Sequence, residues 1–356
     1  MKKNIAILTL QGNANYGNRL QNYALEQVIQ ANFGNVTSLI VDNRPNTIKF
    51  LSWGKTQLKN LKQLSKVKQR KAKYSVFLPF SKNYLHVKKL KNFDSYDYVI
   101  VGSDQVWNPH YMRKSDKGKW FLDFIPQQKR LSYAASFGVT QIPQDSVPLF
   151  KKGLQEMKMI SVREYAGIEL VNELSGREAK LVADPTMLLT QNEWFDLINK
   201  QKESRVPKNK KYILIYILSK LSEAKRSSIK QFAQKNNLEI LQIMGDTFDD
   251  QHHIYNPIEF IEAVANAEMI FTDSFHCTVF SIIFNSPFCV FERADEGTES
   301  RLKTLLSKFE FEEHLSSKTN TDDFQQIYDH TDFSKVPTIL EKERKEGIEF
   351  LRKAID

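Results

Sequence analysis

The chain has 356 residues, 41% of them hydrophobic and 12% aromatic, which excludes a disordered polymer and favours two compact domains. Its formal net charge is +9, but residues 49–91 hold 13 basic and no acidic residues, and the remainder, with 38 basic and 42 acidic residues, is mildly acidic. No apolar run reaches the roughly 20 residues of a membrane span, and the apolar start ends at Leu10 without a small-residue cleavage site. We therefore expect a cytoplasmic protein.

The first 200 residues alternate between strand-like and helix-like patterns. Apolar runs predict strands at residues 5–10, 37–42, 98–102, 130–137, 159–163 and 179–183. Apolar residues at helical spacing predict helices at about 18–31 and 165–174. Because alternating strands and helices form parallel sheets with right-handed crossovers, we expect residues 1–200 to form a Rossmann-like domain.

A second alternating series follows a polar linker, "NKQKESRVPKNKK" at 199–211. It predicts strands at 212–218, 239–244, 269–272 and 288–291, and helices ending near 236 and at 257–267 and 276–285. Cys277 and Cys289 lie in this apolar sequence and are expected to be small buried hydrophobes. We expect a second doubly wound domain at 201–334 facing the first across a cleft, and a helix at 335–356 that packs back across the interface.

The basic insert at 49–91 is a distinct part of the first domain. One helical face and its edges gather Leu51, Trp53, Leu58, Leu61, Leu64 and Val67, and lysines fill most of the remainder. Such a segment can lie at the periphery of an anionic membrane, where each basic residue contributes about 1 kcal/mol. The alternative is a solvated, partly packed excursion of the domain. Nucleic acid is not an expected partner, because no nucleic-acid motif is present.

Polar residues follow four of the expected strands. They are "QGNANYGNR" at 11–19, "GSDQVWNP" at 102–109, "SVRE" at 161–164 and "TDSFHCT" at 272–278. Because the carboxyl ends of parallel strands lie at one edge of a sheet, these loops can converge where α/β proteins bind ligands.

His276 and Ser274 stand at the start of an apolar helix that follows the strand at 269–272. Free backbone N–H groups and the helix dipole favour anions there. His276 is therefore a candidate general acid or base, or an anion ligand. In the alternative interpretation Asp273 or Ser274 caps the helix and His276 is a hydrogen-bonded neighbour.

Arg163 ends an apolar strand, where a guanidinium is well placed for a bidentate contact with a carboxylate or phosphate. The alternative is an ion pair with Glu164 or another acid. Asp104 is either a catalytic carboxylate or a structural one, and Trp107 is expected in the core.

The first loop has more amides than a turn requires. Asn13, Asn15, Asn18 and Arg19 can hydrogen-bond sugar hydroxyls or an anion, whereas turn chemistry explains only the glycines. Neither a GxxxxGK[ST] nor a GxGxxG nucleotide motif occurs. His252 and His253 are adjacent and lack ligands at metal spacing, so no metal site is predicted.

Six strings occur together in order: "GNANYGNRLQNYAL", "VGSDQVWN", "SYAASFG", "SVRE", "ADPT" and "DSFHCTVFSIIFNSPF". In this combination the chain resembles the polysaccharide pyruvyl transferase family from about residue 5 to about residue 310. The resemblance implies a fold similar to GT-B glycosyltransferases, phosphoenolpyruvate as donor, a glycan or lipid-linked oligosaccharide as acceptor, and a cyclic pyruvate ketal as product.

The resemblance also suggests site residues. Arg163 and His276 look like the donor-binding and catalytic pair, and the first loop looks like part of the acceptor side. We add Asp104 as a candidate base and Arg301 as a candidate phosphate ligand. The reaction needs an acid for carbon, a base for hydroxyls and cations for the donor anions, but no metal or other cofactor.

Two rival functions remain open from the sequence. A nucleotide-sugar glycosyltransferase could share the fold, because fold does not fix function. A non-catalytic glycan-binding protein would bind glycan without turning over any donor.

Overall fold

The computed structural model describes residues 2–10, 15–40, 61–89, 93–112, 118–244, 253–293, 298–316 and 323–356. The first domain has a five-stranded parallel sheet of order β3-β2-β1-β4-β5. Its strands are β1 (Lys3–Leu8), β2 (Gly34–Ile40), β3 (Val87–Lys89), β4 (Tyr98–Val101) and β5 (Arg130–Ser132). Beyond β5, isolated parallel bridges lead to the parallel pair β6 (Ser161–Val162) and β7 (Lys180–Leu181).

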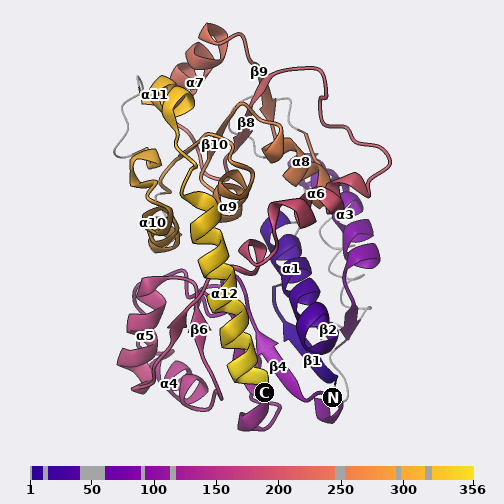
Figure 1. Ribbon diagram of the computed structural model, residues 1–356, viewed down its shortest axis with the longest axis vertical. Helices are drawn as coiled ribbons and strands as arrows, with labels where there is room; N and C mark the ends of the chain where they lie inside the picture. Colours follow the sequence, from indigo (N-terminus) through magenta and orange to yellow (C-terminus); the bar gives the residue numbers. More distant parts are fainter. Residues whose placement is uncertain are drawn as a thin grey trace.

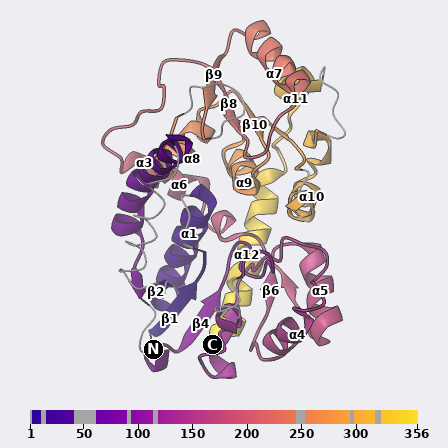
Figure 2. The same ribbon diagram turned by 180° about the vertical axis from the view of Figure 1, so that it is seen from behind.

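Helices cover both sides of the first domain. They are α1 (Tyr16–Asn32), α3 (Leu61–Tyr84), α4 (Val147–Gln155), α5 (Tyr165–Ser175) and α6 (Gln191–Asn199). Helices α1 and α3 lie on one side, and α4 and α5 on the other, in both Figure 1 and Figure 2. This arrangement is the one expected for a doubly wound sheet.

The second domain has a four-stranded parallel sheet of order β11-β10-β8-β9. Its strands are β8 (Tyr212–Tyr216), β9 (Glu239–Gln242), β10 (Met269–Thr272) and β11 (Phe288–Val290). Its helices are α7 (Glu223–Lys235), α8 (Pro257–Ala265), α9 (Phe275–Phe284), α10 (Thr298–Phe309) and α11 (Asp323–His330). The two-domain α/β class expected from the sequence is confirmed.

Helix α12 (Val336–Ile355) runs from the second domain along the first, so that the C-terminus lies near the N-terminus (Figure 1). In its first half, Glu343 pairs with Lys308 of α10 at 2.6 Å. At its end, the Ala354 carbonyl accepts a hydrogen bond of 2.7 Å from Lys158 in the first domain. The helix therefore ties the two domains together.

A shared apolar core also joins the domains. Tyr16, at the start of α1, stacks on Phe260 of α8 with ring centroids 4.2 Å apart, and its hydroxyl donates to the Tyr255 carbonyl at 2.9 Å. The cysteines Cys277 and Cys289 are fully buried, as expected. Trp107 is also fully buried, as the sequence suggested.

One expected strand is shorter than its apolar pattern. The run 130–137 forms a strand only to Ser132, because Ala134 adopts a left-handed conformation with φ of 50°. The chain then rejoins the sheet at Ala135, which bridges Asp104 on one side and Val162 on the other. The helices α4, α6, α10 and α11 were not assigned from the sequence.

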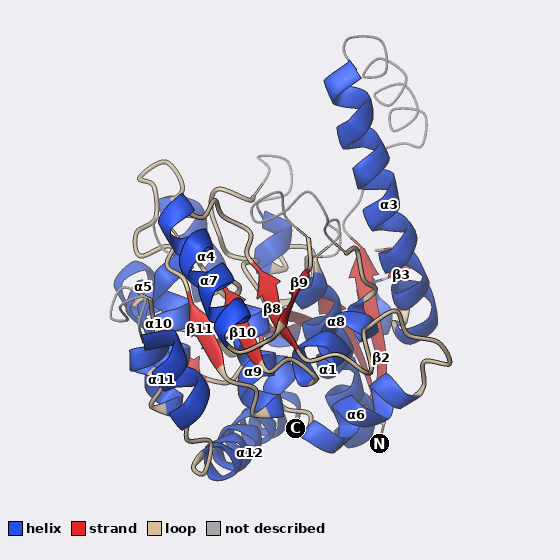
Figure 3. Ribbon diagram, turned by 90° about the horizontal axis from the view of Figure 1, so that it is seen from above, coloured by secondary structure: helices blue, strands red, loops and turns tan. Residues whose placement is uncertain are grey.

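Helix α3 and strand β3 lie in the described part of the basic insert, residues 61–89. The N-terminal end of α3 projects away from the rest of the molecule, whereas Phe77 and Phe80 near its other end are buried (Figure 3). Of the predicted apolar face and its edges, Leu51, Trp53 and Leu58 lie outside the described residues, and Leu61, Leu64 and Val67 belong to the first two turns of α3. Among the helices that the structure describes, none is both long and apolar enough to cross a membrane.

Candidate active site

Parallel pairing brings two of the expected polar strand ends, 102–109 and 161–164, to one edge together with the turn that holds Asp184. Asp104 bridges Ala135, Ala135 bridges Val162, and Val162 pairs with Leu181, so the four residues are in register across adjacent segments. The residues that follow, Arg163 and Asp184, therefore lie at the same edge as Asp104. The expected convergence of these loops is present.

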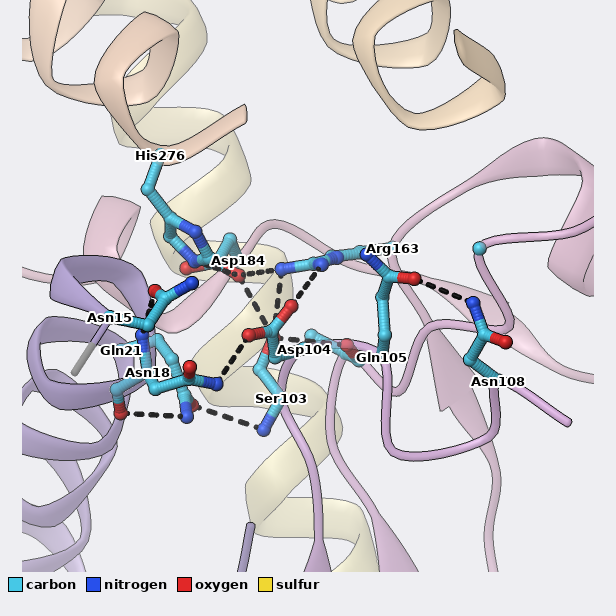
Figure 4. Close-up of polar contacts among 12 residues, drawn as sticks. Asn15, Asn18, Gln21, Ser103, Asp104, Gln105, Asn108, Arg163, Asp184 and His276 are labelled. Carbon is cyan, nitrogen blue, oxygen red and sulfur yellow. Dashed lines mark hydrogen bonds and ion pairs between the residues drawn. The ribbon is translucent and has the colours of Figure 1, made fainter. Parts of the chain in front are cut away.

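Arg163 holds two carboxylates together. Its Nη2 donates to Oδ1 of Asp104 at 2.8 Å, and its Nη1 donates to Oδ2 of Asp184 at 2.7 Å (Figure 4). The contact with Glu164 is longer, at 3.9 Å, and the Arg163 side chain is 1% exposed. Burial alone would lower the pKa of this guanidinium, but the two carboxylates raise it above its ordinary value. Arg163 thus forms internal ion pairs with Asp104 and Asp184 rather than with Glu164. An internal ion pair was the alternative that the sequence left open.

Asp184 is the acid that sequence reasoning missed. It caps the short 3-10 helix at 185–187, and its Oδ1 accepts from the Thr186 backbone N–H at 3.1 Å and from Oγ1 at 2.8 Å. Its Oδ2 accepts from Ser103 Oγ at 2.8 Å in addition to Arg163. Burial would raise the pKa of Asp184, but His276 and Arg163 hold it well below its usual range. The signal available in the sequence was "ADPT", a fifth polar strand end.

Asp104 is engaged at both carboxylate oxygens. Oδ1 binds Arg163, and Oδ2 accepts from Nδ2 of Asn18 in α1 at 2.6 Å. Burial raises its pKa, but Arg163, His276 and Arg301 together lower it below the ordinary value. Its φ of 70° is a left-handed conformation, a kind of strain that clusters at functional sites.

His276 comes from the second domain and faces this ion pair. It lies in the first turn of α9, whose N-cap is Ser274. Its Nε2 is 3.5 Å from Oδ2 of Asp184, and no hydrogen bond to Nε2 is formed within the described part of the chain. Ser274 accepts from the Cys277 N–H at 3.5 Å, so its side chain acts as the cap that the sequence allowed.

Gly17 of α1 makes the approach of His276 feasible. A Cβ atom at residue 17 would lie 2.0 Å from Nδ1 of His276, closer than real Cβ atoms come to any neighbour. A glycine is therefore required where α1 meets the imidazole ring. Gly17 and His276 are far apart in the sequence, and no sequence pattern predicted their contact.

Arg301 of α10 is a second buried guanidinium at the site. When the side-chain amide of Gln105 is turned so that its oxygen faces Arg301, this oxygen accepts hydrogen bonds from the two Nη atoms at 3.2 and 2.8 Å. Arg163 and Arg301 both lie over the ring of Phe275, at 4.4 and 5.8 Å from its centroid. Burial and the charge of Arg163 lower the pKa of Arg301 to about 10. Among the described residues, no carboxylate forms an ion pair with Arg301.

The first-loop residues are divided between loop and helix. Asn13 lies outside the described residues, and Asn15 is the N-cap of α1, accepting from the Asn18 N–H at 3.1 Å. Because Asn15 caps the helix, α1 begins at Tyr16, two residues before the expected start. Asn18 and Arg19 therefore belong to its first turn and are 5% and 6% exposed, and burial lowers the pKa of Arg19 to about 10.

Asp273 has a structural role next to the site. It accepts hydrogen bonds of 2.8 Å from the backbone N–H groups of Leu218 and Ser219, and it pairs with Arg293 at 3.1 Å. These contacts hold the loop after β8 against β10. His253 stacks on Tyr255, with ring centroids 5.3 Å apart, and His252 lies outside the described residues. Within the described ranges, no three His, Cys, Asp or Glu side chains come together as metal ligands.

The fold is similar to that of solved sugar-nucleotide enzymes. A UDP-GlcNAc 2-epimerase from Neisseria meningitidis matches with a TM-score of 0.50 and 9% identity over 99% of each chain. A UDP-N-acetylglucosamine 2-epimerase from Rickettsia bellii matches with a TM-score of 0.52 and 9% identity, over 100% of this chain and 97% of the other. At such identity the likeness shows the fold alone, which is of the GT-B type. No curated protein matches the chain.

A family model gives the decisive comparison. The model of the polysaccharide pyruvyl transferases matches residues 15–295, a range that includes Arg163, Asp184 and His276. It covers most of both domains, which the resemblance in the sequence had implied. The chain belongs to the polysaccharide pyruvyl transferase family.

Proposed function

We propose that the protein transfers a pyruvyl group from phosphoenolpyruvate to two hydroxyls of a sugar in a cell-surface polysaccharide or its lipid-linked precursor. The products are a cyclic pyruvate ketal and inorganic phosphate. The observation that carries this proposal is the arrangement of His276 and Arg301 from the second domain around the Arg163 ion pair of the first. Family membership supports the transferase class, and we propose His276 as the acid and a buried guanidinium as the cation that the donor needs.

Arg301 is the residue we propose for the donor anion. It is buried, it lies near a second guanidinium, and Asp104 and Glu164 attract it without forming a direct ion pair with it within the described part of the chain. A bound phosphate or carboxylate would relieve both the desolvation and the repulsion. Arg163 was expected to bind the donor directly, but its two Nη groups are already bound to Asp104 and Asp184. We therefore propose that Arg163 shapes the site while Arg301 contacts the donor.

One titratable side chain is sufficient for the proton transfers. In the first step, His276 gives a proton to the methylene carbon of the donor as the first sugar hydroxyl bonds to the neighbouring carbon, and His276 takes back the proton of that hydroxyl. In the second step, the bond to phosphate breaks and the second hydroxyl bonds to the same carbon. The proton of the second hydroxyl leaves with the phosphate. The scheme needs neither Asp104 as a base nor a metal.

The acceptor side is proposed at the start of α1. Asn15 and Asn18 stand at the N-terminus of this helix, next to Gly17 and His276. Their amides are used within the protein, with Asn15 capping the helix and Asn18 bound to Asp104. An acceptor would therefore meet the half-buried Asn15 at the start of this helix.

Donor specificity tests the proposal against its rivals. The purified protein is incubated with an acceptor glycan and either phosphoenolpyruvate or a sugar nucleotide, and the release of phosphate or nucleotide is measured. Phosphate release that needs both phosphoenolpyruvate and glycan supports the proposal. Nucleotide release supports a glycosyltransferase, and glycan binding without turnover of any donor supports a binding protein. His276→Ala is expected to lower phosphate release roughly 100-fold or more.

A lipid-linked acceptor would require access to a membrane surface. The 13 basic residues at 49–91 and the projection of α3 support a peripheral contact with anionic lipid (Figure 3). Co-sedimentation with anionic and neutral vesicles at low and high salt tests this contact. Binding that needs anionic lipid and weakens with salt supports it, and sedimentation that ignores lipid charge argues for a solvated segment.

A further inference from the structure

One contact at the site is not used by the proposed reaction. Nε2 of His276 is buried and lies 3.5 Å from Oδ2 of Asp184, its nearest carboxylate oxygen in the described structure. The separation is longer than a good hydrogen bond, but such contacts are often loose before substrate binds. The geometry therefore resembles the imidazole–carboxylate pair of hydrolytic triads, in which the carboxylate orients the base.

The position of Asp184 does not depend on His276. Its two oxygens accept hydrogen bonds from the Thr186 N–H and hydroxyl, from the Ser103 hydroxyl and from Arg163. These donors come from the turn after β7, the turn after β4 and the end of β6. Asp184 is therefore a fixed acceptor beside the imidazole ring, rather than a side chain that follows the ring.

The other ring nitrogen has the opposite environment. Nδ1 of His276 lies against Gly17, in the first turn of the 17-residue helix α1. The positive end of the helix dipole and its free N–H groups disfavour a proton on a nearby nitrogen and favour a lone pair. A carboxylate on one side and a helix N-terminus on the other both favour the same neutral tautomer, with the proton on Nε2.

We propose that Asp184 is a positioning residue that holds the proton of neutral His276 on Nε2 and so makes Nδ1 the basic atom of the site. The part of this inference that concerns the reaction rests on the proposed function, because Nδ1 would then exchange protons with the donor carbon and the sugar hydroxyl. The tautomer itself is a property of the free protein. The charged groups that interact with the ring in the described structure are Asp184 and Asp104, and each of these carboxylates is bound to Arg163.

The direct test is the tautomer of His276 in the unliganded wild-type protein. Nitrogen NMR of protein labelled in the histidine rings distinguishes a protonated ring nitrogen from an unprotonated one, and a His276→Gln variant assigns the signal. We expect Nε2 to carry the proton when the ring is neutral. A His276 ring with its proton on Nδ1 would overturn the proposal, whatever the protein does with phosphoenolpyruvate.

Asp184→Asn tests the cause. The variant should lose the preference for the Nε2 tautomer, shift the acidic limb of the pH–rate profile and lower kcat roughly 100-fold or more, with a smaller change in the KM of phosphoenolpyruvate. A folded variant with an unchanged His276 tautomer and an unchanged pH profile would reduce Asp184 to a structural residue. Should the variant not fold, the wild-type tautomer still decides.

A matched control exists in the first domain. Glu26 is fully buried and accepts from His86, with Nδ1 of the ring 2.8 Å from Oε2. Glu26→Gln should therefore alter the NMR signals of His86 and leave those of His276 unchanged, and Asp184→Asn should do the reverse. If Glu26→Gln changed the His276 tautomer as much as Asp184→Asn does, the effect would be a general response to lost buried charge, and the proposal would fail.

Discussion

Replacing Gly17 with alanine tests the contact between the two domains at the site. The new Cβ would lie 2.0 Å from Nδ1 of His276, 2.5 Å from Cγ and 2.6 Å from Cε1. Carbon and nitrogen atoms in contact are about 3.5 Å apart, so the ring or the helix must move by roughly 1.5 Å. A misplacement of about 1 Å at a reacting group can lower a rate about 100-fold. We expect Gly17→Ala to lower turnover by about that factor.

Stability should respond differently from turnover. Alanine is favoured over glycine within a helix by roughly 0.5–1 kcal/mol, which offsets part of the crowding at residue 17. The assay is phosphate release from phosphoenolpyruvate in the presence of acceptor glycan, together with a thermal melt. Gly17→Ala with native melting and turnover within about threefold of the wild type would refute the assignment of the His276 ring to the chemistry.

Gly167→Ala is the matched control for this substitution. Gly167 also lies in the first turn of a helix, α5, but its Cβ would meet Val162 at 3.1 to 3.3 Å, so a shift of a few tenths of an ångström is enough. We expect a much smaller loss of turnover than at Gly17. Equal losses in the two variants would show that any added methyl group disturbs the enzyme.

Three further predictions concern stability. Arg163→Gln leaves the buried carboxylates of Asp104 and Asp184 without their cation and should lower the free energy of unfolding by about 3–5 kcal/mol in urea titrations; an unchanged midpoint would contradict the ion-pair account. Because the pKa values of both acids are lowered in the folded state, their contribution is present above the unfolded pKa of about 4 and is lost as the pH falls through the folded values. The stability difference between the wild type and Asp104→Asn should therefore shrink on acidification, and a constant difference from pH 7 to pH 3 would argue against the lowered pKa. Tyr16→Phe removes the 2.9 Å bond to the Tyr255 carbonyl but keeps the ring, and should cost about 1 kcal/mol in thermal melts, whereas no loss would show that this bond does not hold the domains.

The sequence predicted the fold more fully than the partners within the site. Strand–helix alternation located both sheets, because buried parallel strands are continuous apolar runs that stand out between amphipathic helices. The carboxyl ends of parallel strands lie at one edge of a sheet, and this rule correctly predicted that Asp104 and Arg163 lie close together. It could not decide whether Arg163 binds a ligand or an internal acid, since that depends on which carboxylates reach the same edge.

Contacts between distant segments explain what sequence reasoning missed. Asp184 appeared in the sequence only within the string "ADPT", and its contact with His276 requires the two domains to be docked. The glycines and asparagines around Gly17 indicated an irregular loop. In the structure Asn15 caps a helix that includes Gly17. The break at Ala134 arises from its left-handed conformation, which the apolar run did not reveal.

The most direct test of the account is mass spectrometry of an acceptor glycan after incubation with the protein and phosphoenolpyruvate. We predict that the glycan gains one pyruvate ketal for each phosphate released, that the ketal links two hydroxyls of one sugar, and that His276→Ala forms almost none. A glycan that stays unmodified with phosphoenolpyruvate but gains a sugar from a sugar nucleotide would contradict the account.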